Sequence, residues 1–181
     1  MISLTTRRDD LAPQALASLI HDDVLQSLGV AMLGVDLCRR LHLRARYEDA
    51  LDELTGVVRA AAAALVASDE LLPNLRRFAP AETASATRPS LVVIVTAPRQ
   101  PTPARPTAGP NQIAQTLAAC ELMARRCRHQ YEAGLGEDTM AELELLLQRL
   151  EFVTVAYRAL MNDLREAAGT PSLAPALART A

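Results

Sequence analysis

The hydrophobic pattern of the first forty residues predicts a long amphipathic helix. From residue 11 to residue 43, apolar residues recur at steps of three and four, which is the spacing of one face of an α-helix. Pro13 falls in the first turn, where proline is tolerated, and Asp9 or Asp10 is placed to cap the helix. The expected apolar stripe consists of Leu16, Ile20, Val24, Ser27 or Leu28, Ala31, Val35 and Cys38.

A second helix is predicted from about Glu48 to Arg77, after a short polar connection over 44–47. Its apolar seam is regular over three and a half heptads. Pro73 lies in its last turns and should kink or loosen that end. Two helices joined by so few residues must be antiparallel neighbours, so residues 11–77 form a helical hairpin. The expected seam is Leu51, Leu54, Val58, Ala61, Leu65, Ser68, Leu72 and Leu75.

The hairpin is repeated within the chain. A shift of 89 residues superimposes 24–76 on 113–165 without a gap, and 14 of the 53 aligned positions are identical. Both copies have the same loop length, followed by Glu-Asp, which points to an internal duplication. A second hairpin is therefore expected over 111–166. Its seam would be Met140, Leu143, Leu147, Leu150, Thr154, Tyr157, Met161 and Leu164.

The remaining segments are poor in helical pattern. Residues 1–10 are polar and expected to be frayed, and 167–181 are expected to form a disordered tail. Residues 78–110 are rich in Pro, Ala and Thr and are interpreted as a linker. An apolar island at 91–95 interrupts the linker, and its role is open: a β-prone piece packed on the side of the helices, or a tether or lid.

Composition supports an all-α fold of two antiparallel hairpins that form a four-helix bundle. Half of the residues are apolar and only 3% are aromatic, without Trp, which favours helices packed through aliphatic seams. The net charge of −2 gives no indication of nucleic-acid binding. The longest apolar runs, 60–67 and 91–95, are much shorter than the roughly 20 residues of a membrane span. We expect no membrane insertion.

The three cysteines have no paired spacing and are interpreted as reduced, buried thiols of a cytoplasmic protein. No histidine, cysteine and carboxylate group has metal-ligand spacing, so neither a metal nor another cofactor is expected to reside in the protein. His42 and His129, near helix ends, are expected to be surface groups or partners of a helix dipole.

The candidate chemistry lies in the first helix. His21 is followed at once by Asp22 and, five residues later, by Gln26. Neutral imidazole is a good nucleophile near pH 7, and an adjacent carboxylate can orient its tautomer and raise its basicity. Gln26 is a little over one turn beyond His21, so we expect it near the same face of the helix.

The order His-Asp-x-x-x-Gln, in a leucine-rich helix of a hairpin, resembles the phosphoacceptor domain of two-component histidine kinases in the subgroup with this signature. The resemblance covers roughly residues 10–80. It implies that His21 carries a phosphoryl group, that Asp22 supports it, and that Gln26 positions a water that hydrolyses the aspartyl phosphate of a response regulator. The regulator's receiver domain would supply Mg²⁺ and the acceptor Asp. Its docking surface would include Leu25, Gly29 and Met32.

Proteins of this family form the domain as a homodimer of hairpins. With two hairpins on one chain, an intramolecular pseudo-dimer is the economical architecture. The second copy would be degenerate, because the shift of 89 pairs His21 with Pro110 and Asp22 with Asn111, and proline cannot accept a phosphoryl group. A monomeric pseudo-dimer and a homodimer with swapped hairpins are both compatible with the sequence.

The family's ATP-binding domain has no counterpart in the sequence. No Asp-x-Gly-x-Gly occurs, and the close glycine pair in Gly134-Leu135-Gly136 falls in the second hairpin's loop. We therefore expect no autonomous kinase, and whether the protein is an enzyme stays open.

Two functions remain. The first is a histidine phosphotransfer protein of a phosphorelay, with regulator phosphatase activity as an addition. The second is a non-catalytic module that binds response regulators or kinase hairpins and has a vestigial His21. A helical bundle of unrelated function is a third, weaker interpretation.

Overall fold

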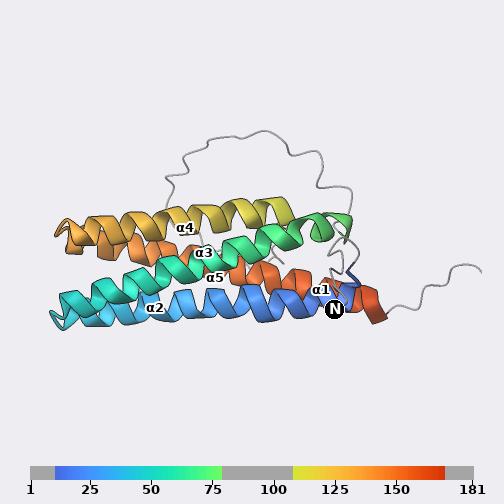
Figure 1. Ribbon diagram of the computed structural model, residues 1–181, viewed down its shortest axis with the longest axis horizontal. Helices are drawn as coiled ribbons and strands as arrows, with labels where there is room; N and C mark the ends of the chain where they lie inside the picture. Colours follow the sequence, from blue (N-terminus) through green and yellow to red (C-terminus); the bar gives the residue numbers. More distant parts are fainter. Residues whose placement is uncertain (1–10, 79–107, 170–181) are drawn as a thin grey trace, which may run out of the picture.

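The computed structural model describes residues 11–78 and 108–169, and the regular structure within them is entirely helical (Figure 1). The elements are α1 (Pro13–Leu19), the π-helical turn η2 (Ile20–Leu25), α2 (Gln26–Leu43), α3 (Tyr47–Phe78), α4 (Pro110–Glu132) and α5 (Gly136–Gly169). The first three run on as one helix over Pro13–Leu43. The all-α expectation is confirmed.

Several expectations concern residues beyond those described. Residues 1–10, most of the expected linker, its apolar island at 91–95, and residues 170–181 lie outside the described residues. Asp9 and Asp10 are among them. The N-cap residue of α1 is Ala12, without a side-chain cap, and Pro13 is in the first turn as expected. At the other ends, α3 continues through Pro73 to Phe78, and α5 extends three residues into the expected tail.

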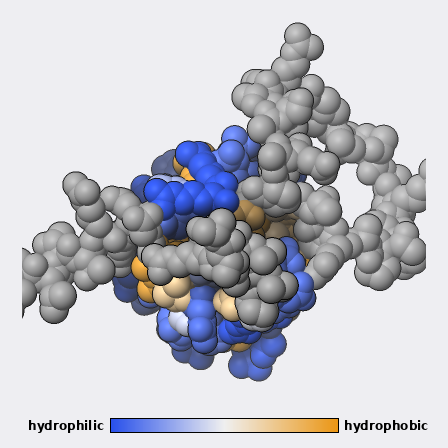
Figure 2. Space-filling view, turned by 90° about the vertical axis from the view of Figure 1, so that its right-hand side faces the viewer, coloured by the Kyte–Doolittle hydropathy of each residue, from blue (hydrophilic) through white to orange (hydrophobic). Residues whose placement is uncertain are grey.

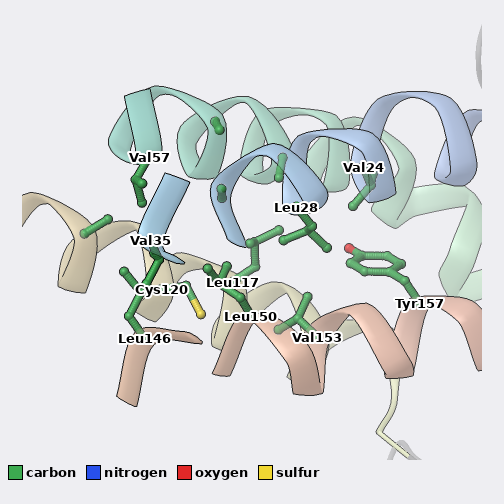
Figure 3. Packing of buried hydrophobic residues seen from close by; sticks show 14 of the residues in the cluster. Val24, Leu28, Val35, Val57, Leu117, Cys120, Leu146, Leu150, Val153 and Tyr157 are labelled. Carbon is green, nitrogen blue, oxygen red and sulfur yellow. The ribbon is translucent and has the colours of Figure 1, made fainter. Parts of the chain in front are cut away.

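The four long helical segments lie side by side. The α2 helix packs on α3, α3 on α4, and α4 on α5, while α5 contacts α1, η2 and α2 (Figure 1). One hydrophobic core runs through all of them, and Figure 3 shows Leu28, Leu117 and Leu150 meeting in it from three different helices. The stripe expected for the first helix is confirmed, since its members are fully buried or nearly so, except for the half-buried Ser27.

The expected seam of α3 is half correct. Leu54, Ala61, Ser68 and Leu75 are buried as predicted. The other four core positions, which are predicted at 51, 58, 65 and 72, each lie one residue earlier. In the first half of α5, Thr139 and Leu146 likewise replace Met140 and Leu147 in the core. The other expected seam residues of this helix are buried as predicted: Leu143, Leu150, Thr154, Tyr157, Met161 and Leu164. The predicted seam follows the largest aliphatic side chains. In the structure, alanines occupy much of the centre of the core, and the larger residues pack at its margin. In α3 the core positions are Ala50, Val57, Ala64 and Leu71, and Leu51, Val58 and Leu65 flank them.

The two interhelical loops have the same geometry. In the first, Ala45 N–H donates to the His42 carbonyl and Arg46 N–H to the Leu41 carbonyl. In the second, 89 residues later, Gly134 N–H donates to the Tyr131 carbonyl and Leu135 N–H to the Gln130 carbonyl. Both patterns are Schellman motifs, and the residues that need a left-handed backbone are Ala45, with φ 56°, and Gly134, with φ 80°.

Residues 89 positions apart also contact each other across the core. The Ser68 hydroxyl is hydrogen-bonded to the Tyr157 hydroxyl, and His42 Nδ1 lies 3.1 Å from the Tyr131 hydroxyl oxygen. Cys38 and Cys127 also stand 89 positions apart, and burial first, then the electrostatic effect of Cys127, raises the pKa of the Cys38 thiol to about 12. In a two-fold symmetric assembly, residues that touch their own equivalents lie on the axis.

By length and composition alone, the helix Pro13–Leu43 is one that could cross a membrane. About a third of its most apolar window, 33%, is buried against the other helices. The sequence pattern missed this property because the longest apolar run in that helix, 28–35, is much shorter than the roughly 20 residues of a membrane span.

Candidate functional site

His21 is an exposed residue whose ring is held by the next side chain. It lies in η2, and its Nδ1 is 2.9 Å from Asp22 Oδ1. The two side chains are 56% and 62% exposed, so a macromolecular partner can reach the ring. The neighbouring Ile20 and Val24 are fully buried and fix the turn that carries the pair.

The hydrogen bond to Asp22 defines which ring nitrogen is available for chemistry. An ionised carboxylate can only accept a hydrogen bond, so Nδ1 of His21 carries the proton in this pair. The lone pair of the neutral ring is then on Nε2, which faces away from Asp22. Positive charge that develops on the ring when Nε2 reacts is offset by the carboxylate.

The π-helical turn brings His21 and Gln26 together. In a regular α-helix, residues five apart point about 140° away from each other, so a regular α-helix would not give His21 and Gln26 the shared face that we expect. A π-helix is built on i→i+5 hydrogen bonds and has a wider turn, so residues five apart lie closer to one face than they do in an α-helix. Within Ile20–Leu25 the helix has this form, and the side chains of His21 and Gln26 line the same depression.

That depression is a surface hollow of about 320 Å³ between η2 and α5. Its lining from the first helix is His21, Leu25 and Gln26, and its lining from α5 is Arg158, Met161 and Asn162. The α5 residues were missed by sequence reasoning, because helical spacing does not tell which turn of another helix faces His21. The repeat nevertheless contains a signal for these residues. Arg158 and Asn162 differ in chemistry from their equivalents 89 residues earlier, which are Asp69 and Pro73.

The expected docking residues follow the margin of α2 that faces α5. Leu25 and Met32 are half-buried against the core, and Met32 Sδ lies 3.6 Å from Thr154 Oγ1 of α5. Gly29 lies between them in sequence, and a Cβ built on it meets nothing within 4 Å. The structure therefore leaves open space beside Gly29, next to the hollow that contains His21.

The corresponding place in the second hairpin differs in chemistry. Pro110 begins α4 and is buried, and Asn111, at the position of Asp22, accepts a hydrogen bond of 2.9 Å from Arg76 Nε. Asn111 thus pairs with an arginine of α3, whereas Asp22 pairs with a histidine.

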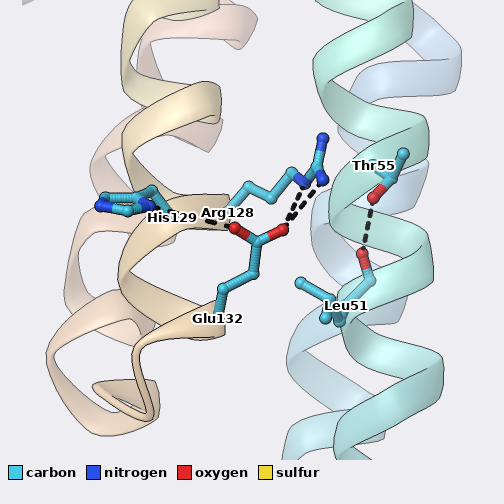
Figure 4. A network of polar contacts seen from close by, with 5 residues as sticks. All are labelled: Leu51, Thr55, Arg128, His129 and Glu132. Atoms are coloured by element: carbon cyan, nitrogen blue, oxygen red, sulfur yellow. Dashed lines mark hydrogen bonds and ion pairs between the residues drawn. The ribbon is translucent and has the colours of Figure 1, made fainter.

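The other histidines lie far from this hollow, near the loops. His129 is exposed, as expected, and its Nδ1 is 3.9 Å from Glu132, which also binds Arg128 (Figure 4). His42 is not a surface group, because its side chain is only 9% exposed, but it does lie in the last turn of α2, where the dipole alternative puts it. It packs edge-on against Tyr47 and Tyr131, because the two loops converge there.

No group of three or more His, Cys, Asp or Glu side chains that could hold a metal ion occurs within residues 11–78 and 108–169. At the end of the molecule that contains α1 and the last turns of α5, the described surface is mainly hydrophilic, with some hydrophobic side chains between the helices (Figure 2).

No protein-family model, curated protein or solved structure matches the chain. Its function is therefore inferred from the geometry of the site.

Proposed function

We propose that this protein is a histidine phosphotransfer protein that relays phosphoryl groups through His21 to or from response-regulator aspartates. The single observation that carries the proposal is the His21–Asp22 hydrogen bond of 2.9 Å on an exposed turn. It combines an oriented nucleophile with open access, which is what transfer between two proteins requires.

The reaction needs little more than positioning. Nε2 of His21 attacks the phosphorus of an aspartyl phosphate, an N–P bond forms, and the P–O bond to the aspartate breaks as its carboxylate leaves. The proton on Nδ1 stays in place, and Asp22 offsets the charge of the phosphorylated ring. The receiver domain of the regulator supplies Mg²⁺ and the acceptor aspartate, so no cofactor has to reside in this protein.

Gln26 gives the same site a second activity. Its amide is exposed beside His21, where it can orient a water for attack on a regulator's aspartyl phosphate. Regulator phosphatase activity is therefore part of the proposal.

The architecture we propose is an intramolecular pseudo-dimer of two kinase-like dimerisation hairpins. The equivalent loop hydrogen bonds and the contacts between residues 89 apart support it. A chain that contains its own partner hairpin would act as a monomer, with one active and one degenerate face. A homodimer with swapped hairpins would keep the same contacts between chains.

The receiver domain is proposed to dock next to His21, on Leu25, Gly29 and Met32. A histidine kinase is a second candidate partner, as a source of the phosphoryl group. The proposed compartment is the cytoplasm, and the interface with a partner needs neither nucleic acid nor a membrane.

A second candidate function is favoured by an apolar row on α2. Val30, Leu33 and Leu37 are 59%, 73% and 43% exposed and follow one another at steps of three and four. An exposed apolar row of this kind is typical of a protein-binding surface. It would allow the protein to bind a response regulator or a kinase hairpin even if His21 were vestigial.

One experiment separates these functions. The purified protein is incubated with response regulators carrying labelled phosphate, beside His21→Ala, Gln26→Ala and, as a matched control, His129→Ala. We expect acid-labile, base-stable label on the wild type and on His129→Ala, and none on His21→Ala. If the regulator loses its label faster in the presence of the protein, and if this effect requires Gln26, the protein has phosphatase activity.

Binding of the regulator without any transfer would favour the interaction module. If no regulator binds, the proposed function is rejected.

A further inference from the structure

The hollow beside His21 is built by both hairpins. The first helix contributes the imidazole and the Gln26 amide, and α5 contributes the guanidinium of Arg158 and the amide of Asn162. The residues that line the hollow therefore include a nucleophile from one helix, and a cation and a hydrogen-bond donor from another. Phosphoryl groups are bound in proteins by this combination of guanidinium and amide donors.

The donors on α5 are not engaged elsewhere. Arg158 and Asn162 make no ion pair or hydrogen bond with any other part of the chain that the structure describes. Several other arginines are paired: Arg39 with Glu144, and Arg128 with Glu132. The two donors at the hollow thus remain available to a ligand.

The equivalent place on the other face has the opposite character. The shift of 89 pairs Arg158 with the carboxylate of Asp69, Asn162 with Pro73, and His21 with Pro110. A carboxylate repels a phosphoryl group, and proline has no side-chain donor. The acceptor histidine and the counterparts of Arg158 and Asn162 are therefore both missing from the second face, where Arg76 binds Asn111 instead.

We propose that Arg158, assisted by Asn162, binds the phosphoryl group while it is transferred to and carried on His21. The inference rests on the proposed function and deepens it. The second hairpin has lost its own histidine but supplies the anion-binding half of the site to the first. Arg158 is a positioning residue, which holds the phosphoryl oxygens in line with Nε2 and balances their charge.

Phosphoramidate tests the proposal without a partner protein. In this reaction Nε2 of His21 attacks phosphorus, the N–P bond of the reagent breaks, and ammonia leaves. The rate of His21 phosphorylation is measured against reagent concentration by intact-mass spectrometry. The variants are Arg158→Gln, Arg158→Lys and Asn162→Ala, with Arg149→Gln as the control, because Arg149 is an exposed arginine on the same helix outside the hollow.

We expect Arg158→Gln to raise the KM for phosphoramidate roughly tenfold, as the loss of a charged hydrogen bond to an anion does. Arg158→Lys should recover part of this loss, and Arg149→Gln should leave KM unchanged. All variants should have the wild-type melting temperature, because the side chains exchanged are not packed in the core.

Two results overturn the proposal while leaving the proposed function intact. One is an unchanged KM in Arg158→Gln, and the other is an equal rise in Arg149→Gln, which would reflect net charge alone. Absence of phosphorylation at His21 in the wild type would instead reject the proposed function, and this inference with it.

Discussion

The hydroxyl groups of Ser68 and Tyr157 are hydrogen-bonded to each other in the core, and the two residues stand 89 positions apart, at equivalent places in the two hairpins. Figure 3 shows the Tyr157 hydroxyl reaching in from α5 towards the first helix. Both residues are almost fully buried. A buried polar pair of this kind is stable only while both partners are present.

Removing one partner of this pair should therefore cost more than removing both. We expect Tyr157→Phe and Ser68→Ala each to lower the free energy of unfolding by about 1–3 kcal/mol. The double variant should lose less than the sum, which a double-mutant cycle in urea measures. Tyr47→Phe is the matched control, because the Tyr47 side chain is exposed, and it should change little. Strictly additive losses would mean that the two hydroxyls do not interact.

Alkaline pH should destabilise the protein through its buried tyrosine and thiols. Burial raises the pKa of Tyr157 from 10.0 to about 12 and that of Cys120 from 9.0 to about 11. The unfolded chain loses these protons first, so stability is complete below about pH 9 and falls as pH rises towards 12. The urea midpoint measured from pH 8 to 11.5 should show this decline.

Tyr157→Phe provides the control for the pH experiment. It should remove part of the decline above pH 10 and leave the part between pH 9 and 10, which comes from the thiols. Identical profiles for the variant and the wild type would contradict the assigned burial of the Tyr157 hydroxyl.

The two loops offer a matched pair of backbone substitutions. Ala45 adopts φ 56°, which is strained for a residue with a Cβ, whereas Gly134 adopts φ 80° without strain. Ala45→Gly should therefore stabilise the protein by about 1 kcal/mol, and Gly134→Ala should destabilise it by a similar amount. A Cβ at Gly134 meets nothing within 4 Å, so the effect would be one of backbone conformation. Thermal unfolding of both variants measures it, and changes of equal sign would refute the assignment.

Alanine substitutions at Gly29 and Gly34 in α2 distinguish an effect on core packing from an effect on partner binding. A Cβ at Gly34 would lie 2.7 Å from Val57 Cγ2, and one at Gly29 would meet only open space. Gly29→Ala should stabilise the helix by roughly 0.5–1 kcal/mol, while Gly34→Ala should destabilise the protein by about 1–3 kcal/mol through overpacking.

Binding of a phosphorylated receiver domain completes this comparison. If Gly29 lies under the docked partner, Gly29→Ala should weaken binding although it stabilises the fold. Unchanged affinity would exclude Gly29 from the interface.

The hydrophobic pattern was sufficient to predict the helices and their boundaries within a few residues. It failed in the seam of α3, where two of the four core positions that it missed are alanines, Ala50 and Ala64, which carry little signal. It also could not predict the π turn, because a π turn depends on one locally accommodated extra residue and leaves no repeated mark in the pattern.

The candidate site was predictable only on one side. His21, Asp22 and Gln26 are close in sequence, so a motif could identify them. Arg158 and Asn162 reach the hollow from α5 by tertiary packing, which the sequence does not specify. The sequence difference between Arg158 and its repeat equivalent, Asp69, is the one feature that could have indicated these two residues.

The central claim is that one histidine on one face of the duplicated bundle accepts a phosphoryl group. The most direct measurement is to map the phosphorylated position by mass spectrometry and phosphorus NMR at alkaline pH, after incubation with a phosphorylated receiver domain. We predict a single phosphoryl group on Nε2 of His21. Phosphorylation of His129 or His42 instead, or an unchanged phosphoryl content in His21→Ala, would contradict the account.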